Sequence, residues 1–194
     1  MHRYSIDNDS YIKILVGLTV VSALLNAMIN IFIIPAIVKN DVLIQLVSLS
    51  VSFFISFELI FLIFDRLLWK WWFFNKLIKY PNISGKWKGT IDNHEFPVVE
   101  ATVEIKQTWT KIIIILETET AKSKTKSLTF YAEDSDNNPE IYYVYENKSN
   151  TKKLSHHGGT GELTFVKDKN MLVGQYYTDK FRENHGDIVL NKID

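Results

Sequence analysis

The chain has 194 residues, with 22 basic and 22 acidic side chains, 46% hydrophobic residues and no cysteine. This length suits one domain or two small ones, and the balanced charge does not fit a protein whose body binds DNA or RNA. The absence of cysteine excludes a disulfide scaffold, a thiolate metal site and a cysteine nucleophile.

Two long apolar runs predict a pair of transmembrane helices. Residues 14–38 contain no charge, and residues 42–64 contain only Glu58. A helix needs about 20 residues to cross the bilayer core, and both runs are too long for the apolar region of a signal peptide. Because three residues separate them, we expect a tight hairpin. Residues 1–80 then form a membrane domain with an aromatic interfacial linker, and residues 81–194 form a second domain.

Basic residues predict the orientation of this hairpin. The short loop between the runs has one lysine, whereas both outer flanks carry several basic side chains. The positive-inside rule therefore places both termini in the cytoplasm, with two passes through the membrane. The outer basic residues are Arg3, Lys13, Arg66, Lys70, Lys76 and Lys79.

Polar residues recur at helical spacing within both runs, including Asn26 and Asn30 in the first and Ser52 in the second. Such residues form hydrogen bonds between helices in lipid. They hold the hairpin together, form a face for oligomer packing, or line water when several hairpins assemble, and these interpretations remain open. Glu58 is a carboxylate inside a span, which is a functional candidate by default.

After Pro81 the pattern changes to period two, which is typical of strands. No segment there reads as a long amphipathic helix. Eight strands joined by short loops predict an all-β domain, and a small up-and-down antiparallel barrel of eight strands fits its length. The predicted strands are Gly85–Asp92, Val98–Trp109, Lys111–Thr120, Ser127–Glu133, Ile141–Asn147, Thr160–Val166, Met171–Thr178 and Gly186–Ile193.

The first strand opens with Gly85-Lys86-Trp87. This string resembles the G-x-W opening of lipocalin-type barrels, in which the tryptophan plugs the closed end. The resemblance implies a lipocalin-like barrel with Trp87 in its core. Alternation within the strand also puts Trp87 on the interior face.

Simple up-and-down alternation gathers four loops at one end of the barrel: 93–97, 121–126, 148–159 and 179–185. This end is rich in Lys, Arg and His and has few acidic residues, so it predicts a mouth that attracts anions. The other end shares its side with the membrane linker, so the mouth faces away from the bilayer. The basic residues are Lys122, Lys124, Lys126, Lys148, Lys152, Lys153, Lys180 and Arg182, with His94, His156, His157 and His185.

Candidate ligand-binding residues combine cations with aromatic faces. Arg182 is the only arginine after residue 80, and a lone arginine at a mouth suits bidentate phosphate binding. Nucleobases stack on aromatic rings. The predicted ligand-binding set is Arg182, Lys180, Thr178, Tyr177, Lys126, Tyr131, Tyr142 and Trp109.

Motifs that carry catalysis are missing from the sequence. It has no H-E-x-x-H zinc motif, phosphate loop or G-x-S-x-G elbow. The adjacent pair His156-His157 would point to opposite faces of a strand, which is poor geometry for a metal. We therefore expect a protein that is not an enzyme and has neither a metal nor a cofactor.

Five features follow one another along the chain. They are the two-helix hairpin, the aromatic linker, the string Ile83-Ser84-Gly85-Lys86-Trp87-Lys88-Gly89-Thr90, and the closing strings Gly174-Gln175-Tyr176-Tyr177-Thr178 and Gly186-Asp187-Ile188-Val189-Leu190. In this order the chain resembles the two-transmembrane, β-rich effectors of bacterial anti-phage cyclic-oligonucleotide signalling (CBASS). The resemblance implies that a partner nucleotidyltransferase makes a cyclic dinucleotide, which the barrel binds. The protein then oligomerises and disrupts the inner membrane, and the infected cell dies.

Two other functions compete with this one. A membrane-tethered, lipocalin-like binder of lipid or another hydrophobic ligand would need an apolar mouth. A membrane-anchored enzyme would need a convergent acid and base, and the carboxylates of the sequence are dispersed.

Overall fold

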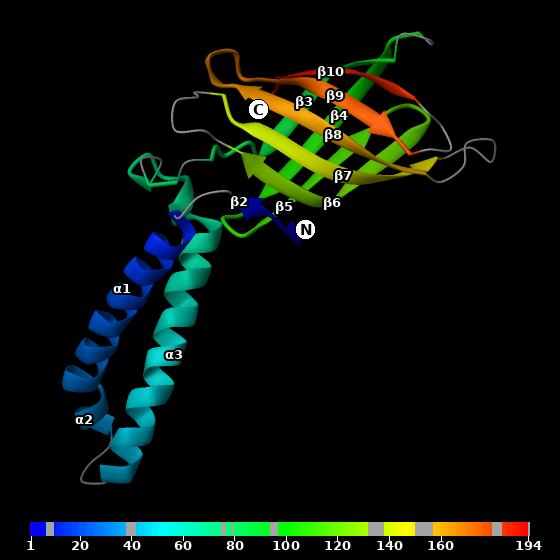
Figure 1. Ribbon diagram of the computed structural model, residues 1–194. Coiled ribbons are helices and arrows are strands. Elements are labelled where there is room, and N and C mark those ends of the chain that lie inside the picture. The colour runs from blue at the N-terminus through cyan, green and yellow to red at the C-terminus, as the bar shows by residue number, and fades with distance from the viewer. Residues whose placement is uncertain are drawn as a thin grey trace. The chain divides into compact units, whose positions relative to one another are not determined.

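The computed structural model describes residues 1–6, 10–37, 42–74, 77–78, 80–93, 97–131, 138–149, 157–179 and 184–193. The chain divides into two compact units (Figure 1). One contains Lys79–Asp194 together with the N-terminal residues Met1–Asp7, and the other contains Asn8–Ile78.

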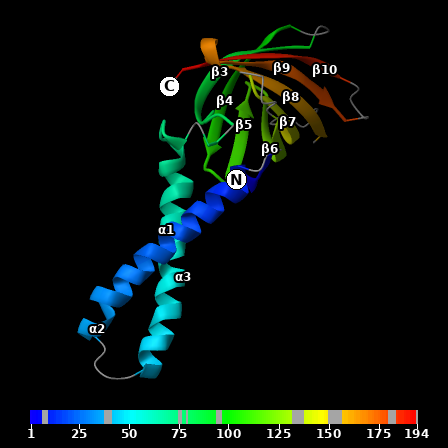
Figure 2. The ribbon, with the colours of Figure 1, turned by 60° about the vertical axis from the view of Figure 1, so that its left-hand side comes forward.

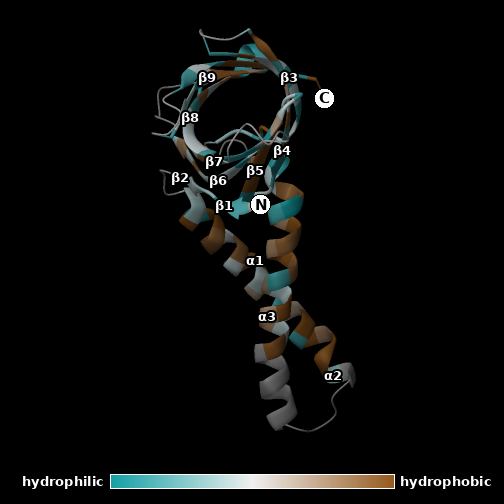
Figure 3. Cartoon of the chain, turned by 90° about the vertical axis from the view of Figure 1, so that its right-hand side faces the viewer, coloured by the Kyte–Doolittle hydropathy of each residue, from teal (hydrophilic) through white to brown (hydrophobic). Residues whose placement is uncertain are grey.

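The helical unit contains α1 (Ser10–Phe32), α2 (Ile34–Ile37), α3 (Val42–Arg66) and the short 3₁₀ helix η1 (Leu68–Lys70). Among the described residues, α1 is long and apolar enough to cross a membrane, which supports membrane association. The other predicted span coincides with α3, whose side chains are described from Val51 onward. Hydrophobic residues dominate the described parts of both helices in Figure 3.

The polar residues of the helices meet between α1 and α3. The side-chain amide of Asn30 donates hydrogen bonds to Ser52 Oγ at 3.1 Å and to Asn26 Oδ1 at 3.0 Å. The Ser52 hydroxyl donates to Asn26 Oδ1 as well. These contacts favour the interpretation that the three residues hold the hairpin together. Glu58 is exposed on α3.

Eight strands form a closed antiparallel barrel, as the sequence predicts. Their order around the sheet is β5-β4-β3-β10-β9-β8-β7-β6, and a direct β5–β6 pairing closes the ring (Figure 3). Each strand pairs with its sequence neighbours, which is the up-and-down arrangement. The strands are β3 (Gly85–Asp92), β4 (Val99–Gln107), β5 (Lys111–Glu117), β6 (Ala121–Tyr131), β7 (Glu140–Ser149), β8 (His157–Val166), β9 (Met171–Thr178) and β10 (His185–Lys192).

One predicted loop is wrong. We expected residues 121–126 to form a loop, but they begin β6, and the turn lies at residues 118–120 instead. Thr118 makes this turn, because its backbone N–H donates to the Ala121 carbonyl and its Oγ1 accepts from the Ala121 N–H. The same turn carries Glu119, which adds an acidic residue that we had not assigned to this end.

Large side chains fill one end of the barrel. Trp87, as the lipocalin resemblance implies, is fully buried there. Its indole N–H donates to the Ile83 carbonyl at 3.1 Å, and its ring meets Phe165 edge-on at 6.1 Å. Trp109 is buried in the β4–β5 turn, and Tyr80 donates to its carbonyl at 3.1 Å. This end is therefore closed, and it is the end at which the chain enters β3.

The N-terminus supplies two short strands that the sequence did not lead us to expect. β1 (His2–Arg3) pairs antiparallel with β5, and β2 (Ser5–Ile6) pairs parallel with β6. Figures 2 and 3 show this segment beside β5 and β6. Residues that precede the first helix thus form part of the barrel unit.

Candidate functional site

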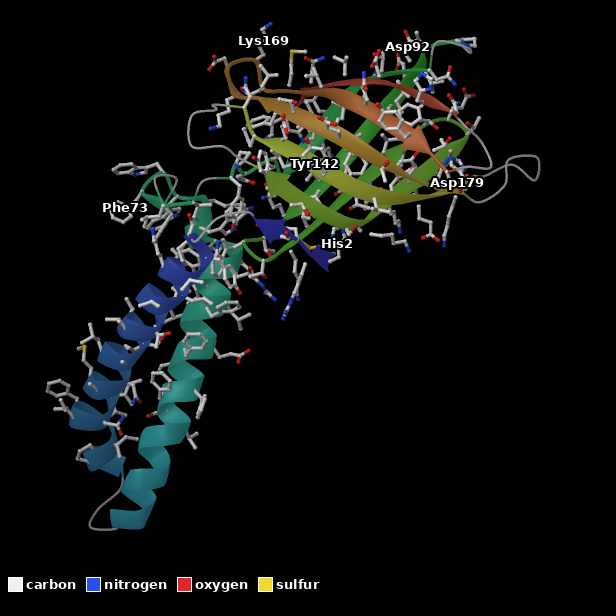
Figure 4. All side chains as sticks on the ribbon, in the orientation of Figure 1. His2, Phe73, Asp92, Tyr142, Lys169 and Asp179 are labelled. Carbon is white, nitrogen blue, oxygen red and sulfur yellow. The ribbon has the colours of Figure 1, made fainter. Side chains whose placement is uncertain are left out.

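A cavity of about 610 Å³ lies inside the barrel. Its lining includes Asn93 at the end of β3, Thr120 before β6, Asn147 near the end of β7 and Asn184 before β10. These positions adjoin the loops opposite the tryptophan-filled end. Figure 4 shows the two ends, with Asp92 and Asp179 at one and Lys169 at the other. The volume falls within the range of small-molecule pockets, about 300–1,000 Å³.

The lining combines aliphatic and polar side chains. Aliphatic side chains from opposite walls form the inner part, and both kinds surround the opening. The aliphatic residues are Ile91, Val99, Val103, Ile114, Leu116, Ala121, Leu163, Ile188 and Leu190, and the polar residues are Asn93, Thr118, Thr120, Ser123, Thr125, Asn147, His157, Thr178 and Asn184. Such a pocket binds mainly through apolar contact, with a few polar groups to orient the ligand.

Two tyrosines of β7 supply the aromatic surface of the cavity. Tyr143 and Tyr145 are both buried, and their ring centroids lie 6.1 Å apart. Their rings lie against β8 where that strand has Gly161 and Gly159. A Cβ on Gly161 would come within 2.2 Å of the Tyr143 ring, and one on Gly159 within 2.5 Å of the Tyr145 hydroxyl oxygen. The glycines therefore make room for these two rings.

Burial and charge shift the ionisation of neighbouring tyrosines on β7. Burial, with a smaller contribution from Tyr145, raises the pKa of Tyr143 well above its ordinary value. Tyr142 donates a hydrogen bond to the Glu140 carboxylate at 2.7 Å. This bond is the main reason that the pKa of Tyr142 rises to about 12. Both hydroxyls therefore stay protonated at physiological pH and can donate hydrogen bonds.

A histidine and an asparagine face each other at the opening. His157 is buried at the start of β8, and its Nε2 lies 3.2 Å from Asn147 Nδ2 on β7. They flank the β7–β8 loop, in which Lys152, Lys153 and His156 lie outside the described residues. The strand ends on both sides of this loop therefore line the cavity.

The β9–β10 loop is held in the same way. The Thr178 hydroxyl donates to the Asn184 carbonyl at 2.9 Å and accepts from the Asn184 N–H at 2.8 Å. Thr178 thus lines the cavity, as a predicted site residue should, but its hydroxyl is bound to the loop. The loop contains Lys180 and Arg182, two further predicted site residues, which lie outside the described part of the chain.

The predicted aromatic residues do not line this cavity. Tyr131, Tyr142 and Tyr177 are between 38% and 48% exposed, on the outer side of the barrel, as Figure 4 shows for Tyr142. Tyr142 and Tyr177 border a separate outer groove of about 300 Å³. Trp109 is buried at the closed end and is also absent from the lining.

In the described part of the chain, two lysines of the predicted basic rim form ion pairs with acidic residues. Lys126 lies at a register shift of β6, is exposed and forms an ion pair with Glu146. Lys122 forms an ion pair with Glu117. These lysines belong to a strand, and their buried neighbour Thr125 occupies the inner face. Lys124 is the one Lys or Arg among the described lining residues.

Strand phase explains why the predicted ligand-binding set left out Tyr143 and Tyr145. Asn147 and Asn184 were also left out, whereas His157 was placed at the mouth but not in that set. In β7, Glu140 and Glu146 alternate with the inner residues and mark Tyr142 as outward-facing. That signal was present in the sequence. In β6 the bulge at Lys126 changes the inward-outward alternation between Thr125 and Leu128, both of which are buried. A regular alternation in the sequence could therefore not have located the bulge.

A closed eight-stranded barrel with a polar-rimmed internal cavity defines a ligand-binding protein of the small-barrel class. Comparison with known families is consistent with this class. Residues 78–192 match the family model described as "Cap15, cyclic dinucleotide receptor domain". Because this match covers more than half of the chain, the protein belongs to the Cap15 receptor-domain family.

Two curated relatives share this similarity. A CD-NTase-associated protein 15 from Yersinia aleksiciae is 27% identical over 137 residues, which cover 68% of this chain and 64% of the relative. A CD-NTase-associated protein 15 from Staphylococcus schleiferi is 30% identical over 135 residues, which cover 67% of this chain and 71% of the relative. The chain thus spans about two thirds of each relative.

Proposed function

We propose that this chain is a membrane-anchored effector of bacterial anti-phage CBASS signalling, whose barrel binds a cyclic dinucleotide made by a partner nucleotidyltransferase. The observation that carries the proposal is the internal cavity of about 610 Å³, found in the domain that matches the Cap15 cyclic dinucleotide receptor family. The names of the two curated relatives, CD-NTase-associated protein 15, support the nucleotidyltransferase as partner.

The lining suits the parts of such a ligand. A cyclic dinucleotide has two bases and two phosphates. Tyr143 and Tyr145 offer aromatic surfaces against which a base can stack, and stacking of this kind contributes about 1–3 kcal/mol per base. The amides of Asn147 and Asn184 can form hydrogen bonds with base edges. Lys180 and Arg182, on a loop anchored at Thr178 and Asn184, are our proposed phosphate ligands.

The output that we propose follows the family resemblance. Ligand binding drives self-association and disruption of the inner membrane, and the infected cell dies. The helices α1 and α3 would both span the membrane, with cytoplasmic termini. Asn26, Asn30 and Ser52 would set the packing of the hairpin, and Glu58 would contribute to the oligomeric form. The protein would have no catalytic role, no cofactor and no DNA or RNA partner.

The first experiment measures ligand-dependent stabilisation of the full chain in detergent. Cyclic di-AMP, cyclic di-GMP, cyclic di-UMP and cyclic GMP-AMP are titrated, with the linear dinucleotide pApA as control. A ligand at 100 times its Kd stabilises the folded protein by about 2.7 kcal/mol. We expect one cyclic compound to raise the Tm saturably and pApA to have no effect. A flat response to all four would contradict the proposal.

A second candidate function, the binding of a lipid, is tested in the same titration. The inner part of the cavity is aliphatic, as a binder of lipid would require. Palmitate serves as the probe. Stabilisation by palmitate alone would favour the tethered lipid binder, whereas stabilisation by a cyclic dinucleotide alone would favour the receptor.

A further inference from the structure

The wall of the barrel is completed by the N-terminus of the chain. β5 and β6 pair directly at only three positions, Ile115–Lys124, Leu116–Ser123 and Glu117–Lys122. Beyond these, β5 pairs with β1 and β6 pairs with β2. We call the space between residues 111–114 of β5 and residues 125–131 of β6 the seam. Residues 2–6 occupy the seam, beside β5 and β6 in Figures 1 and 3.

One hydroxyl group lies where the two strands separate. Thr125 Oγ1 accepts a hydrogen bond from the backbone N–H of Ile114 at 3.0 Å and forms another with Nε2 of His2 at 2.9 Å. Thr125 is buried, and it also lines the cavity. A single side chain therefore contacts β5, the N-terminal segment and the space that a ligand would fill.

The bulge in β6 lies at the same place. The register of β6 against β7 shifts between Thr125 and Ser127, which leaves Lys126 as the extra residue. Bulges bend a strand and increase its twist. The bend directs β6 away from β5 and opens the seam that the N-terminal segment fills.

The segment is held by far less pairing than the other strands. β1 and β2 have two residues each, whereas the barrel strands have between seven and eleven. Short, edge-paired segments belong to the least stable part of a fold. The segment therefore has the least backbone pairing in the wall, and its release must also break the hydrogen bonds of the Tyr4 hydroxyl to the Thr108 and Trp109 carbonyls.

The segment also leads directly into the first helix. Only residues 7–9 connect Ile6 to Ser10, where α1 begins. Ile6 and Ser10 are four residues apart in the chain, so their Cα atoms are separated by at most about 14 Å. A displacement that carries Ile6 beyond this distance from Ser10 must therefore pull on α1.

We propose that the seam is a strand-binding site, and that a ligand in the cavity releases its occupant, residues 2–6, by taking the hydrogen bond of Thr125 from His2. The release is passed to α1 through residues 7–9. This inference rests on the proposed function, and it specifies how occupancy of the barrel reaches the membrane segment.

Thermodynamic linkage makes the inference testable through binding alone. If ligand binding favours release, then holding the segment in the seam must weaken ligand binding by the same factor. Couplings between sites are commonly about 5- to 150-fold. A covalent lock on the segment should therefore raise the Kd of the ligand, and loosening the segment should lower it.

The absence of cysteine permits a clean lock. Arg3 and Lys111 are directly opposite in the β1–β5 pair, and both are exposed. Opposite residues in antiparallel strands have Cα atoms about 4.5–5.5 Å apart, which suits a disulfide. The double variant Arg3→Cys/Lys111→Cys is therefore the lock. Its matched control is Lys88→Cys/Asn191→Cys, an exposed antiparallel pair between β3 and β10.

Calorimetry is performed on the full chain in detergent, with the cyclic dinucleotide that stabilises the wild type most. We expect oxidation of the lock to raise the Kd about fivefold or more and reduction to restore it. Oxidation of the control pair should change the Kd less than twofold. In liposomes that contain a trapped dye, the oxidised lock should abolish ligand-induced dye release, and the reduced form should regain it.

A second variant tests the hydrogen bond itself. His2→Ala removes the partner of Thr125 without touching the lining of the cavity, so the Kd should fall. An oxidised lock with wild-type Kd and wild-type dye release would overturn the inference and leave the proposed function intact. Failure of the wild-type protein to bind any cyclic dinucleotide would instead refute the proposed function.

Discussion

Tyr4 and Tyr80 donate hydrogen bonds to the same carbonyl oxygen, that of Trp109, at 2.6 and 3.1 Å. Both rings also contact Phe130, Tyr4 edge-on at 5.4 Å and Tyr80 in a stacked arrangement at 5.5 Å. Tyr4 precedes the helical unit in the chain and Tyr80 follows it. The two connections between the units are therefore anchored at one turn of the barrel.

This shared acceptor predicts non-additive effects of mutation. Tyr4→Phe or Tyr80→Phe should each lower the free energy of unfolding by about 1 kcal/mol, because the carbonyl keeps one partner. The double variant leaves a buried carbonyl without either tyrosine, so its cost should exceed the sum by about 1 kcal/mol or more. Denaturant titration, monitored by tryptophan fluorescence, measures the free energy of unfolding of the wild type, the two single variants and the double variant. Strictly additive values would contradict the shared role.

The neighbouring tyrosines of β7 offer a matched pair for the ligand site. Tyr143 lines the cavity, whereas Tyr142 is 43% exposed on the outer side. Tyr143→Leu should weaken cyclic dinucleotide binding about 5- to 150-fold, which corresponds to the loss of about 1–3 kcal/mol of stacking. Tyr142→Leu should leave the Kd within twofold. Calorimetry measures the Kd of both variants, and equal changes in Kd would refute the assignment of Tyr143 to the ligand site.

Arg182 remains the sequence-based prediction for phosphate recognition. Arg182→Ala should raise the Kd about 10-fold or more, because a hydrogen bond to a charged group contributes about 1.5–3 kcal/mol. The Tm without ligand should not change. Lys126→Ala is the control, since the ion pair of Lys126 with Glu146 lies on the outer side of β6. An unchanged Kd of the Arg182 variant would refute the proposal that Arg182 binds a phosphate.

The polar cluster of the hairpin predicts a second stability effect. Asn30→Leu removes an interhelical hydrogen bond to Ser52 and a bond to Asn26 within α1, and interhelical hydrogen bonds contribute about 0.6–2 kcal/mol in membranes. We expect the hairpin to unfold at a lower concentration of sodium dodecyl sulfate, as measured by circular dichroism. Thr19→Ala is the control, because the Thr19 hydroxyl donates to Leu15 within its own helix. Equal sensitivity of both variants would contradict this assignment.

Alkaline pH should destabilise the barrel in a predictable window. The pKa of Tyr143 is raised in the folded protein, whereas in the unfolded chain it takes the ordinary value of about 10. Above pH 10 the folded state therefore binds more protons than the unfolded state, and stability falls as pH rises. Below pH 10 this tyrosine has no effect. Tyr143→Phe should lose less Tm between pH 9 and pH 11.5 than the wild type, and parallel curves would contradict the prediction.

Sequence periodicity was sufficient to predict the barrel but not its details. Gly85–Asp92 and Met171–Thr178 have the predicted boundaries because turn residues flank regular alternation. The bulge at Lys126 reversed the inner and outer faces within one strand, and no local pattern reveals such a reversal. β1 and β2 are too short to show any periodicity, and their partners lie more than 100 residues away.

The candidate site was predicted at the end of the barrel where the cavity opens, but most of its predicted aromatic residues lie on the outer faces of their strands. Thr178 lines the cavity, and Asn184 lies at the other end of its loop. Tyr142 and Tyr177 were chosen over Tyr143 and Tyr176, although each pair occupies adjacent positions of one strand. Composition identifies aromatic residues in a strand, but only the phase of the strand decides which of two neighbours points inward.

The up-and-down order of the strands separates two kinds of evolutionary change. Residues at the ends of β3, β5, β7 and β9 line the cavity, whereas β4, β6 and β8 end on the side of the barrel that is anchored to Tyr4 and Tyr80. Loops after the first group of strands can change length and sequence without altering the anchored end. Mutations in these loops can therefore change which ligand binds while the connections to the helical unit at Tyr4 and Tyr80 stay the same.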